Sequence, residues 1–112
     1  MGEGCVFCGI VAGKIPAKKV REDADTLAFQ DLNPQAKTHV LVIPKAHYAS
    51  VLDLPSGSGV MARLAEMASA VAREADLTGF RLVVNTGADG GQTVGHLHLH
   101  LLGGRRMSWP PG

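Results

Sequence analysis

Histidine and leucine alternate strictly from residue 96 to residue 101, near the C-terminal end of a chain of 112 residues. Successive side chains of a β-strand point to opposite faces of the sheet, so His96, His98 and His100 are predicted to share one face. The leucines that alternate with them are predicted to enter the core on the other face. Same-face neighbours on a strand lie about 6.6–6.8 Å apart. We expect this strand to cover residues 94–102, with Gly103 and Gly104 at its end.

The rest of the chain predicts an α+β domain with a mostly antiparallel sheet. β-prone runs predict four more strands at residues 18–21, 26–30, 39–43 and 80–85, the third of them buried on both faces. Residues 5–12 predict a short helix. Apolar residues at spacings of three and four predict one long amphipathic helix, capped by Ser58: Val60, Leu64, Met67, Ala68, Val71, Ala72 and Ala75. This helix leaves sheet edges open, so we expect a homodimer formed by edge pairing.

The length favours one domain over residues 1–112. Hydrophobic residues make up 46% of the chain and charged residues 19%, as in a soluble globular protein. A net charge of +1 gives no electrostatic reason to expect a nucleic acid or a membrane as partner, and no stretch is apolar enough to span a bilayer. The first residues lack the pattern of a secretory signal. We therefore expect a cytoplasmic protein with reduced thiols.

Three histidines at a period of two are hard to explain by packing alone. Alternate histidines on a strand can ligate zinc, or a neutral imidazole can act as a nucleophile. The central His98 is the strongest candidate nucleophile, because a histidine on each side can help to hold its orientation. Such a nucleophile needs one ring nitrogen bonded to a fixed acceptor, such as a backbone carbonyl, and the other nitrogen free. Attack on phosphorus forms a phosphoramidate-type intermediate, which water then hydrolyses without any cofactor.

A glycine-rich segment at residues 86–92 comes shortly before the histidines. Its backbone N–H groups, from Gly87 to Thr93, can turn inward as an anion-binding nest, although most such segments are only turns. Gln92 and Thr93 add side-chain donors, and Asn85 stands at the end of the preceding strand. Next to the histidines, this segment predicts a cradle for a phosphate group.

Cys5 and Cys8 form a Cys-x-x-Cys pair. Such a pair is ambiguous between half of a zinc site, a redox couple and packing. A tetrahedral zinc site needs two further ligands.

The stretch His96-Leu97-His98-Leu99-His100-Leu101-Leu102 matches the pattern of the histidine-triad (HIT) superfamily. The flanks resemble one branch of it, the histidine-triad nucleotide-binding proteins, which are purine nucleoside phosphoramidases. The stretches that carry this resemblance cover nearly the whole chain and lie at residues 13–18, 28–31, 38–45, 85–92 and 103–112.

That resemblance implies a HIT-like fold whose sheet continues across a homodimer. It also implies hydrolysis of purine nucleoside 5′-phosphoramidates, such as adenosine 5′-monophosphoramidate, to the nucleoside monophosphate and an amine. His98 matches the nucleophile, and the matched supporting catalytic residues are His39, His96, His100 and Thr93. Asp31 matches the acceptor of the ribose hydroxyls, and Trp109 lies in a tail, residues 105–112, that reaches the partner's site. The other matched nucleotide-binding residues are Phe7, Ile10, Phe29, Leu41, Asn85, Gln92 and Val94.

The resemblance also implies a ligand set for zinc. Some relatives hold the ion with the Cys-x-x-Cys pair, a histidine after a proline–lysine step and the first histidine of the triad. The matching residues are Cys5, Cys8, His47 and His96. A structural zinc there would occupy His96 and leave His98 free.

Two alternatives stay open. The same scaffold supports dinucleoside polyphosphate hydrolysis or nucleotidyl transfer, although His100 stands where the transferase branch has glutamine, and polyphosphate hydrolases lack the Trp-Pro-Pro-Gly tail. The other alternative is a non-catalytic module that binds purine nucleotides or a protein partner.

Overall fold

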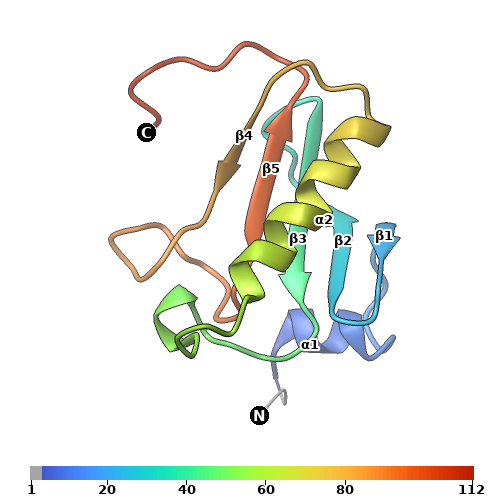
Figure 1. Cartoon of the computed structure of the whole chain (residues 1–112), viewed down its shortest axis with the longest axis vertical. Coiled ribbons are helices and arrows are strands. Elements are labelled where there is room, and N and C mark those ends of the chain that lie inside the picture. The colour runs from blue at the N-terminus through green and yellow to red at the C-terminus, as the bar shows by residue number, and fades with distance from the viewer. Residues whose placement is uncertain (1–3) are drawn as a thin grey trace.

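An antiparallel sheet of five strands organises the molecule, and the computed structural model describes it over residues 4–112 (Figure 1). Residues 1–3 of the predicted domain lie outside the described part. The strand order is β1-β2-β3-β5-β4, and all neighbours are antiparallel. The predicted fold class is thereby confirmed. The strands are β1 Lys19–Glu22, β2 Thr26–Gln30, β3 Thr38–Pro44, β4 Phe80–Val83 and β5 Leu99–Gly103.

Helices pack on both faces of this sheet. The long helix α2 (Val60–Glu74) crosses one face, and the short helix α1 (Val6–Val11) packs on the other (Figure 1). A 3-10 turn, η1 (Val51–Asp53), precedes α2. Because side chains alternate along β3, Val40 and Val42 join the core under α2, whereas Leu41 joins the core under α1. The prediction that this strand is buried on both faces is confirmed.

The helix α2 forms where the spacing of apolar residues predicts it. Six of the seven predicted residues are buried, but Ala75 is exposed and caps the C-terminal end. The predicted N-cap, Ser58, is wrong: Gly59 holds that position with a left-handed φ of 73°. This backbone angle favours glycine, which has no Cβ to clash. The Ser58 hydroxyl instead accepts a bond of 3.4 Å from the Val60 amide.

The last strand is shorter than the sequence predicts. β5 begins at Leu99 rather than at residue 94, and β4 ends at Val83 rather than at residue 85. The pairing partner β3 ends at Pro44, and the Leu97 amide bonds instead to the Tyr48 carbonyl at 2.7 Å. The alternation of faces nevertheless continues through this segment, because Leu97 packs in the core under α2 with the leucines of β5. The histidines therefore face the α1 side.

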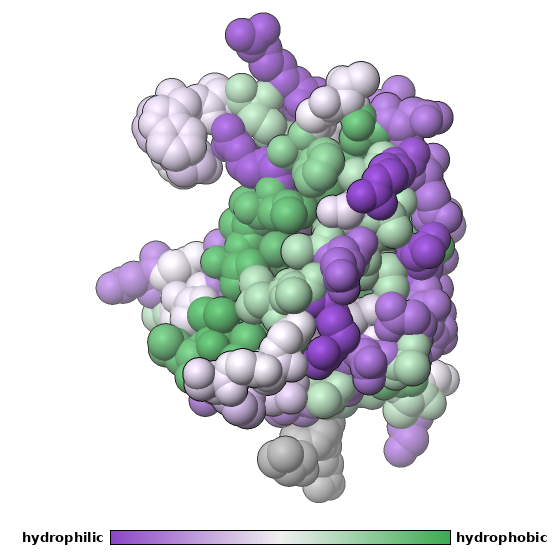
Figure 2. Space-filling model, viewed as in Figure 1, coloured by the Kyte–Doolittle hydropathy of each residue, from purple (hydrophilic) through white to green (hydrophobic). Residues whose placement is uncertain are grey.

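β4 is an edge strand with apolar side chains in solvent. Phe80 and Leu82 are 42% and 40% exposed. Figure 2 shows a green apolar band in this region, beside a hollow that lies below the C-terminal tail. In residues 4–112 no helix combines the length and the hydrophobicity that crossing a membrane requires.

Candidate active site

A pocket of about 320 Å³ opens on the α1 side of the sheet. Its wall is mostly apolar, and the residues of the sequence prediction that line it are Phe7, Ile10, Phe29, Asp31, Leu41, Thr93, Val94, His98 and His100. Sequence reasoning missed other lining residues, namely Val6, Ile15, Pro16, Ala17, Gln30 and Leu32. Leu32, which is 97% exposed, follows Asp31 at a predicted turn. Four of the others lie in the stretches that carry the family resemblance, which was a signal available in the sequence: Ile15, Pro16, Ala17 and Gln30. An apolar slot with few polar groups suits a flat heteroaromatic ligand.

His98 lies in this pocket with one ring nitrogen already bonded. Its Nδ1 is 2.8 Å from the backbone oxygen of His96, and only 5% of the residue is exposed. Because a carbonyl only accepts, Nδ1 carries the proton and a neutral ring keeps a lone pair on Nε2. The Phe7 ring packs edge-on against this imidazole. His98 thus has the geometry that a nucleophilic histidine requires.

A second chain of hydrogen bonds leads through His39 to His100. The Gln35 amide donates to His39 Nδ1 at 3.0 Å, so the proton of a neutral His39 sits on Nε2. That Nε2 lies 2.9 Å from His100 Nδ1, which must therefore accept. A neutral His100 then carries its proton on Nε2.

The Nε2 atom of His100 is buried without a partner among the described residues. Burial lowers the pKa of His100 to about 4, with further lowering by the neighbouring His98 and His39. Burial also lowers the pKa of His39, against the opposing effect of Asp31. Both rings are therefore neutral at pH 7. An unpaired buried donor in a pocket wall is costly and points to an acceptor on a ligand.

Asp31 stands at the end of this chain. Its Oδ1 accepts a bond of 2.8 Å from the Asn33 amide, and its Oδ2 lies 3.4 Å from His39 Nε2. The side chain is 20% exposed, so it retains free lone pairs toward the pocket.

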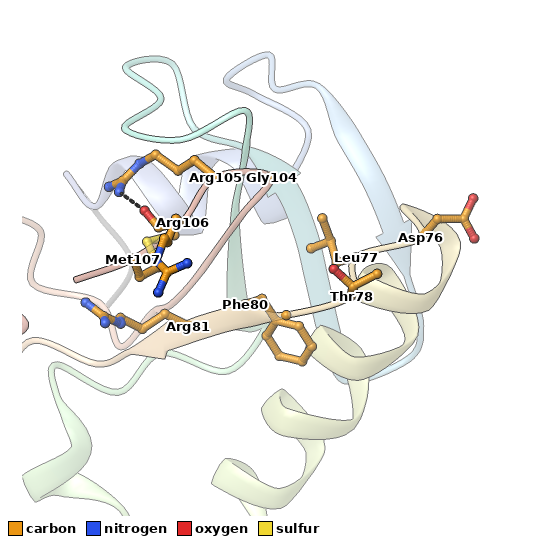
Figure 3. Close-up of a pocket in the computed structure, with 10 residues that line it drawn as sticks. Asp76, Leu77, Thr78, Phe80, Arg81, Gly104, Arg105, Arg106 and Met107 are labelled. Atoms are coloured by element: carbon orange, nitrogen blue, oxygen red, sulfur yellow. Dashed lines mark hydrogen bonds between the residues drawn. The ribbon is translucent and has the colours of Figure 1, made fainter. Parts of the chain in front are cut away.

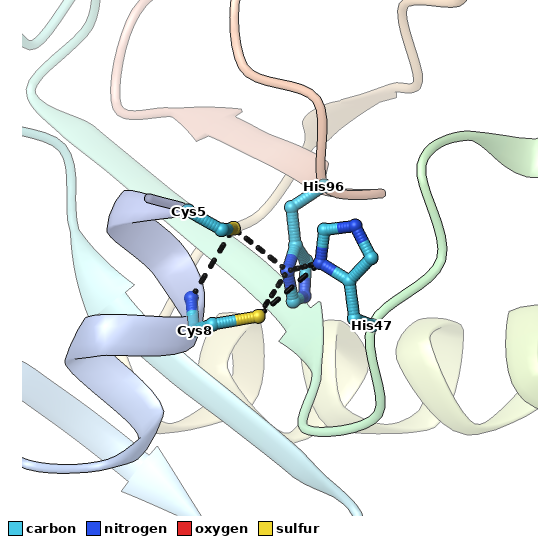
Figure 4. Close-up of side chains that lie close together, drawn as sticks. All are labelled: Cys5, Cys8, His47 and His96. Carbon is cyan, nitrogen blue, oxygen red and sulfur yellow. Dashed lines mark hydrogen bonds between the residues drawn. The ribbon is translucent and has the colours of Figure 1, made fainter. Parts of the chain in front are cut away.

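Behind the pocket, four side chains gather at the N-terminal turn of α1. Cys5 and Cys8 come from α1 and its cap, His47 follows β3, and His96 precedes β5 (Figure 4). Their ligand atoms all lie within 4.8 Å of one another. Cys8 Sγ is 3.2 Å from His47 Nδ1, and the two histidine Nδ1 atoms are 3.1 Å apart.

These residues fit a tetrahedral zinc ion. Zinc bond lengths of about 2.0–2.3 Å place tetrahedral ligand atoms about 3.3–3.8 Å apart, close to the separations here. His96 Nε2 lies 2.9 Å from the Pro44 carbonyl, so it donates and leaves the Nδ1 lone pair for a metal. Burial lowers the pKa of His96, which keeps that lone pair free. Two thiols and two nitrogens make a closed site of structural type, and we expect it to hold zinc rather than a disulfide.

This geometry separates His96 from the pocket chemistry that the sequence prediction also assigned to it. Both of its ring nitrogens are engaged, and the residue is fully buried outside the pocket wall. Its backbone oxygen, rather than its imidazole, contacts His98.

Three backbone amides of the predicted phosphate nest at residues 87–93 bond within the loop itself. The Gly91 and Gln92 amides donate to carbonyls of the same loop, and the Gly87 amide donates to Gln92 Oε1. Gln92 Nε2 donates to the carbonyls of Ala49 and Val94 at 2.7 and 3.0 Å. Gln92 therefore braces the loop beside Thr93 and does not line the pocket. The donors of Gly87, Gly91 and Gln92 that the sequence prediction assigned to a phosphate are thus paired within the protein.

Two other predicted residues lie away from the pocket wall. Asn85 is absent from its lining, and Trp109 is 81% exposed on the tail. The Ser108 carbonyl accepts a bond of 2.7 Å from Arg81, which holds the tail near β4.

A larger and more open depression of about 640 Å³ lies at the other end of β4 and β5 (Figure 3). Arg81, Arg105 and Arg106 line it, and Arg105 donates to the Arg106 carbonyl. Its lining contains no histidine, cysteine or serine.

The fold and the pocket define a class of protein: an α+β domain in which the last strand and the segment just before it bring His100 and His98 to the wall of an apolar pocket. The chain belongs to the HIT domain family, whose model matches residues 12–107. An uncharacterized HIT-like protein of Synechococcus elongatus is 47% identical over 114 residues, which cover all of both chains. A 14 kDa zinc-binding protein of Zea mays is 43% identical, covering 96% of this chain and 87% of its own.

Among solved structures, a HIT family hydrolase from Legionella pneumophila superposes with a TM-score of 0.94 at 49% identity. The match covers 97% of this chain and 100% of that one. Membership of the HIT family, which the sequence resemblance predicts, is thereby confirmed.

Proposed function

We propose that this protein is a hydrolase of purine nucleoside 5′-phosphoramidates, such as adenosine 5′-monophosphoramidate. One observation carries the proposal: His98 lies in the pocket with Nδ1 fixed on a carbonyl, and its Nε2 has no hydrogen-bond partner within residues 4–112. A structural relative at 49% identity is named a hydrolase, which supports the reaction class.

The pocket suits the three parts of such a substrate. The purine occupies the apolar slot between Ile10, Phe29 and Leu41. The ribose hydroxyls donate to the Asp31 carboxylate. This arrangement brings the α-phosphate to His98 and His100, on the side that Thr93 also lines.

Catalysis begins with attack of His98 Nε2 on the α-phosphorus. The new N–P bond forms as the P–N bond to the leaving amine breaks. The Thr93 hydroxyl relays a proton from solvent to the leaving nitrogen, because an unprotonated amine is a poor leaving group. Water then attacks the nucleotidyl-histidine, releases the nucleoside monophosphate and restores the Nε2 lone pair.

His100 stabilises the negative charge on the non-bridging phosphate oxygens in the transition state. Its unpaired Nε2–H donates to a non-bridging phosphate oxygen and so gains the partner that it lacks. His39 acts as a positioning residue, since it fixes the proton of His100 on the pocket side.

The Cys–His cluster binds a structural zinc ion. Its ligands are Cys5, Cys8, His47 and His96, and the ion cross-links α1 to the segments that follow β3 and precede β5. A zinc-binding relative at 43% identity supports this site. A cytoplasmic location, where thiols stay reduced, fits such a ligand set.

We also infer a homodimer through the β4 edge. β4 ends the sheet, and Phe80 and Leu82 leave apolar surface in solvent. A second copy would continue the sheet and cover that surface. The exposed Trp109 would then reach the partner's pocket, which accounts for a large aromatic side chain in solvent.

The test compares turnover of adenosine 5′-monophosphoramidate with that of a dinucleoside triphosphate. We expect faster cleavage of the phosphoramidate, and we expect His98→Asn to bind adenosine monophosphate normally without turnover. A faster triphosphate reaction would favour a polyphosphate hydrolase. Binding of the nucleotide without turnover by the parent protein would identify a non-catalytic module.

A further inference from the structure

We propose that Asp31 couples ribose binding to the donor state of His100, so that the ribose diol raises turnover as well as affinity. The inference rests on the proposed function, which places the ribose hydroxyls on Asp31. What carries it is the chain Asp31–His39–His100, whose ligand atoms lie within 4.8 Å of one another.

The donor and acceptor of this series of hydrogen bonds are fixed at one end only, where Gln35 meets His39. The Gln35 amide can only donate, and it bonds to His39 Nδ1 at 3.0 Å. The single proton of neutral His39 is thereby confined to Nε2. The proton of His100 is held on Nε2 only through the bond that His100 Nδ1 accepts from His39, because Nε2 itself has no partner among the described residues.

Two acceptor atoms lie near the His39 Nε2 atom. The hydrogen bond goes to His100 Nδ1 at 2.9 Å, and the Asp31 carboxylate lies beside it, with Oδ2 3.4 Å from His39 Nε2. A carboxylate is the stronger acceptor, since hydrogen bonds to charged groups are about twice as strong as neutral ones. In the free protein Asp31 therefore weakens the bond that sets the tautomer of His100.

A ribose diol removes this competition. Two hydroxyls that donate to Asp31 reduce its remaining acceptor strength and hold Oδ2 toward the sugar. The bond from His39 Nε2 to His100 Nδ1 then strengthens, which holds the His100 proton more firmly on Nε2 at the phosphate. A nucleotide without the diol still fills the apolar slot but leaves this bond weakened by Asp31.

The first test is spectroscopic and uses compounds that are not hydrolysed. In protein labelled with ¹⁵N-histidine, adenosine should shift the His39 Nε2 and His100 Nδ1 resonances toward a stronger mutual bond. 2′,3′-Dideoxyadenosine, at saturation, should not. The effect should vanish in Asp31→Asn and persist in Asp89→Asn, which removes the same charge from an exposed loop outside the pocket.

The second test measures kcat and KM separately. The 2′,3′-dideoxy phosphoramidate should show a kcat about tenfold below that of the ribose substrate, which corresponds to about one hydrogen bond. The ratio of the kcat values for the two substrates should approach one in Asp31→Asn.

Each result decides between the two proposals. Equal kcat for both sugars with a difference in KM alone would overturn the coupling and leave the hydrolase intact. The adenosine shift in a protein without phosphoramidate turnover would support the coupling and overturn the hydrolase. A His39 proton found on Nδ1, or no binding of adenosine, would overturn the coupling directly.

Discussion

The Phe7 ring stands edge-on to the His98 imidazole, with ring centroids 5.2 Å apart and planes at 84°. Phe7 lies in the chain between Cys5 and Cys8, and its ring also packs edge-on against Phe29 and His96. The helix that supplies both cysteines of the candidate metal site therefore also supplies the side wall of the candidate nucleophile. This contact links the stability of α1 to the orientation of His98.

Replacing Phe7 with alanine should lower both stability and turnover. The side chain is 6% exposed, and its loss should lower the free energy of unfolding by about 3 to 5 kcal/mol. The cavity would also free the His98 ring to rotate, so kcat should fall more than nucleotide affinity does. Urea unfolding and steady-state kinetics measure both effects. Phe7→Leu should retain more activity than Phe7→Ala, and equal kcat in all three proteins would contradict the contact's role.

Rapid quench with substrate should trap a nucleotide on His98. Mass spectrometry of the parent protein should show one added nucleotidyl group, located by peptide mapping at residue 98. His98→Asn should show none, because an amide is a far weaker nucleophile than imidazole. An adduct that maps to His100 or Thr93 would refute the assignment.

The four-ligand cluster should retain zinc through purification. Elemental analysis should find about one zinc per chain, since the site offers four ligands of suitable type. His47→Ala should lose the ion and unfold at a lower temperature, because metal binding contributes to folding. His47→Cys keeps a zinc ligand at the same position, so its zinc content should be higher than that of His47→Ala and close to that of the parent protein. A zinc-replete preparation with less than a few per cent zinc would rule the site out.

The free energy of unfolding should decrease as the pH drops below the pKa of an ordinary histidine side chain. Burial lowers the pKa of His100 to about 4, whereas an unfolded histidine titrates near 6.5. Between these pH values the unfolded chain binds more protons at residue 100 than the folded chain does. The contribution of neutral His100 to the free energy of unfolding is therefore present above pH 6.5 and is lost toward pH 4.

Urea unfolding at pH 7.5 and pH 5 isolates this contribution. In His100→Gln the loss of unfolding free energy between these pH values should be smaller than in the parent by about 1 to 2 kcal/mol. Release of zinc in acid affects both proteins and cancels in the comparison. Identical pH dependence would show that His100 is not buried as a neutral ring.

A charge on the β4 edge should abolish the proposed dimer. Leu82→Lys places an ammonium group on the surface that a second copy would cover. Sedimentation should then find a monomer, while the parent sediments as a dimer. Val20→Lys is the matched control, because Val20 is 38% exposed on β1 at the opposite edge of the sheet. Equal mass for all three proteins would disprove this interface.

The sequence by itself determined the two faces of the histidine segment. The alternation places Leu97 and Leu99 in the core under α2 and His98 on the side of α1, even though β5 begins only at Leu99. Alternation of side chains depends on an extended backbone and not on its hydrogen-bonding partners, which is why it survives where the ladder ends. The long helix was predictable for the same reason, because its apolar spacing is a local property.

Only the tertiary structure decided how the polar groups pair. That the Gln35 amide fixes His39, and that three amides of the glycine-rich loop pair within that loop, depends on contacts that local patterns do not encode. The ends of β4 and β5 were misjudged because a strand ends where its pairing ends: β5 pairs with β3 only from Leu99 onward, opposite Val42, and β4 pairs with β5 only as far as Val83. The sequence therefore predicts which residue types form the site and which face of the sheet they lie on. Its tautomers, its unpaired donor and the engagement of His96 follow only from three-dimensional packing.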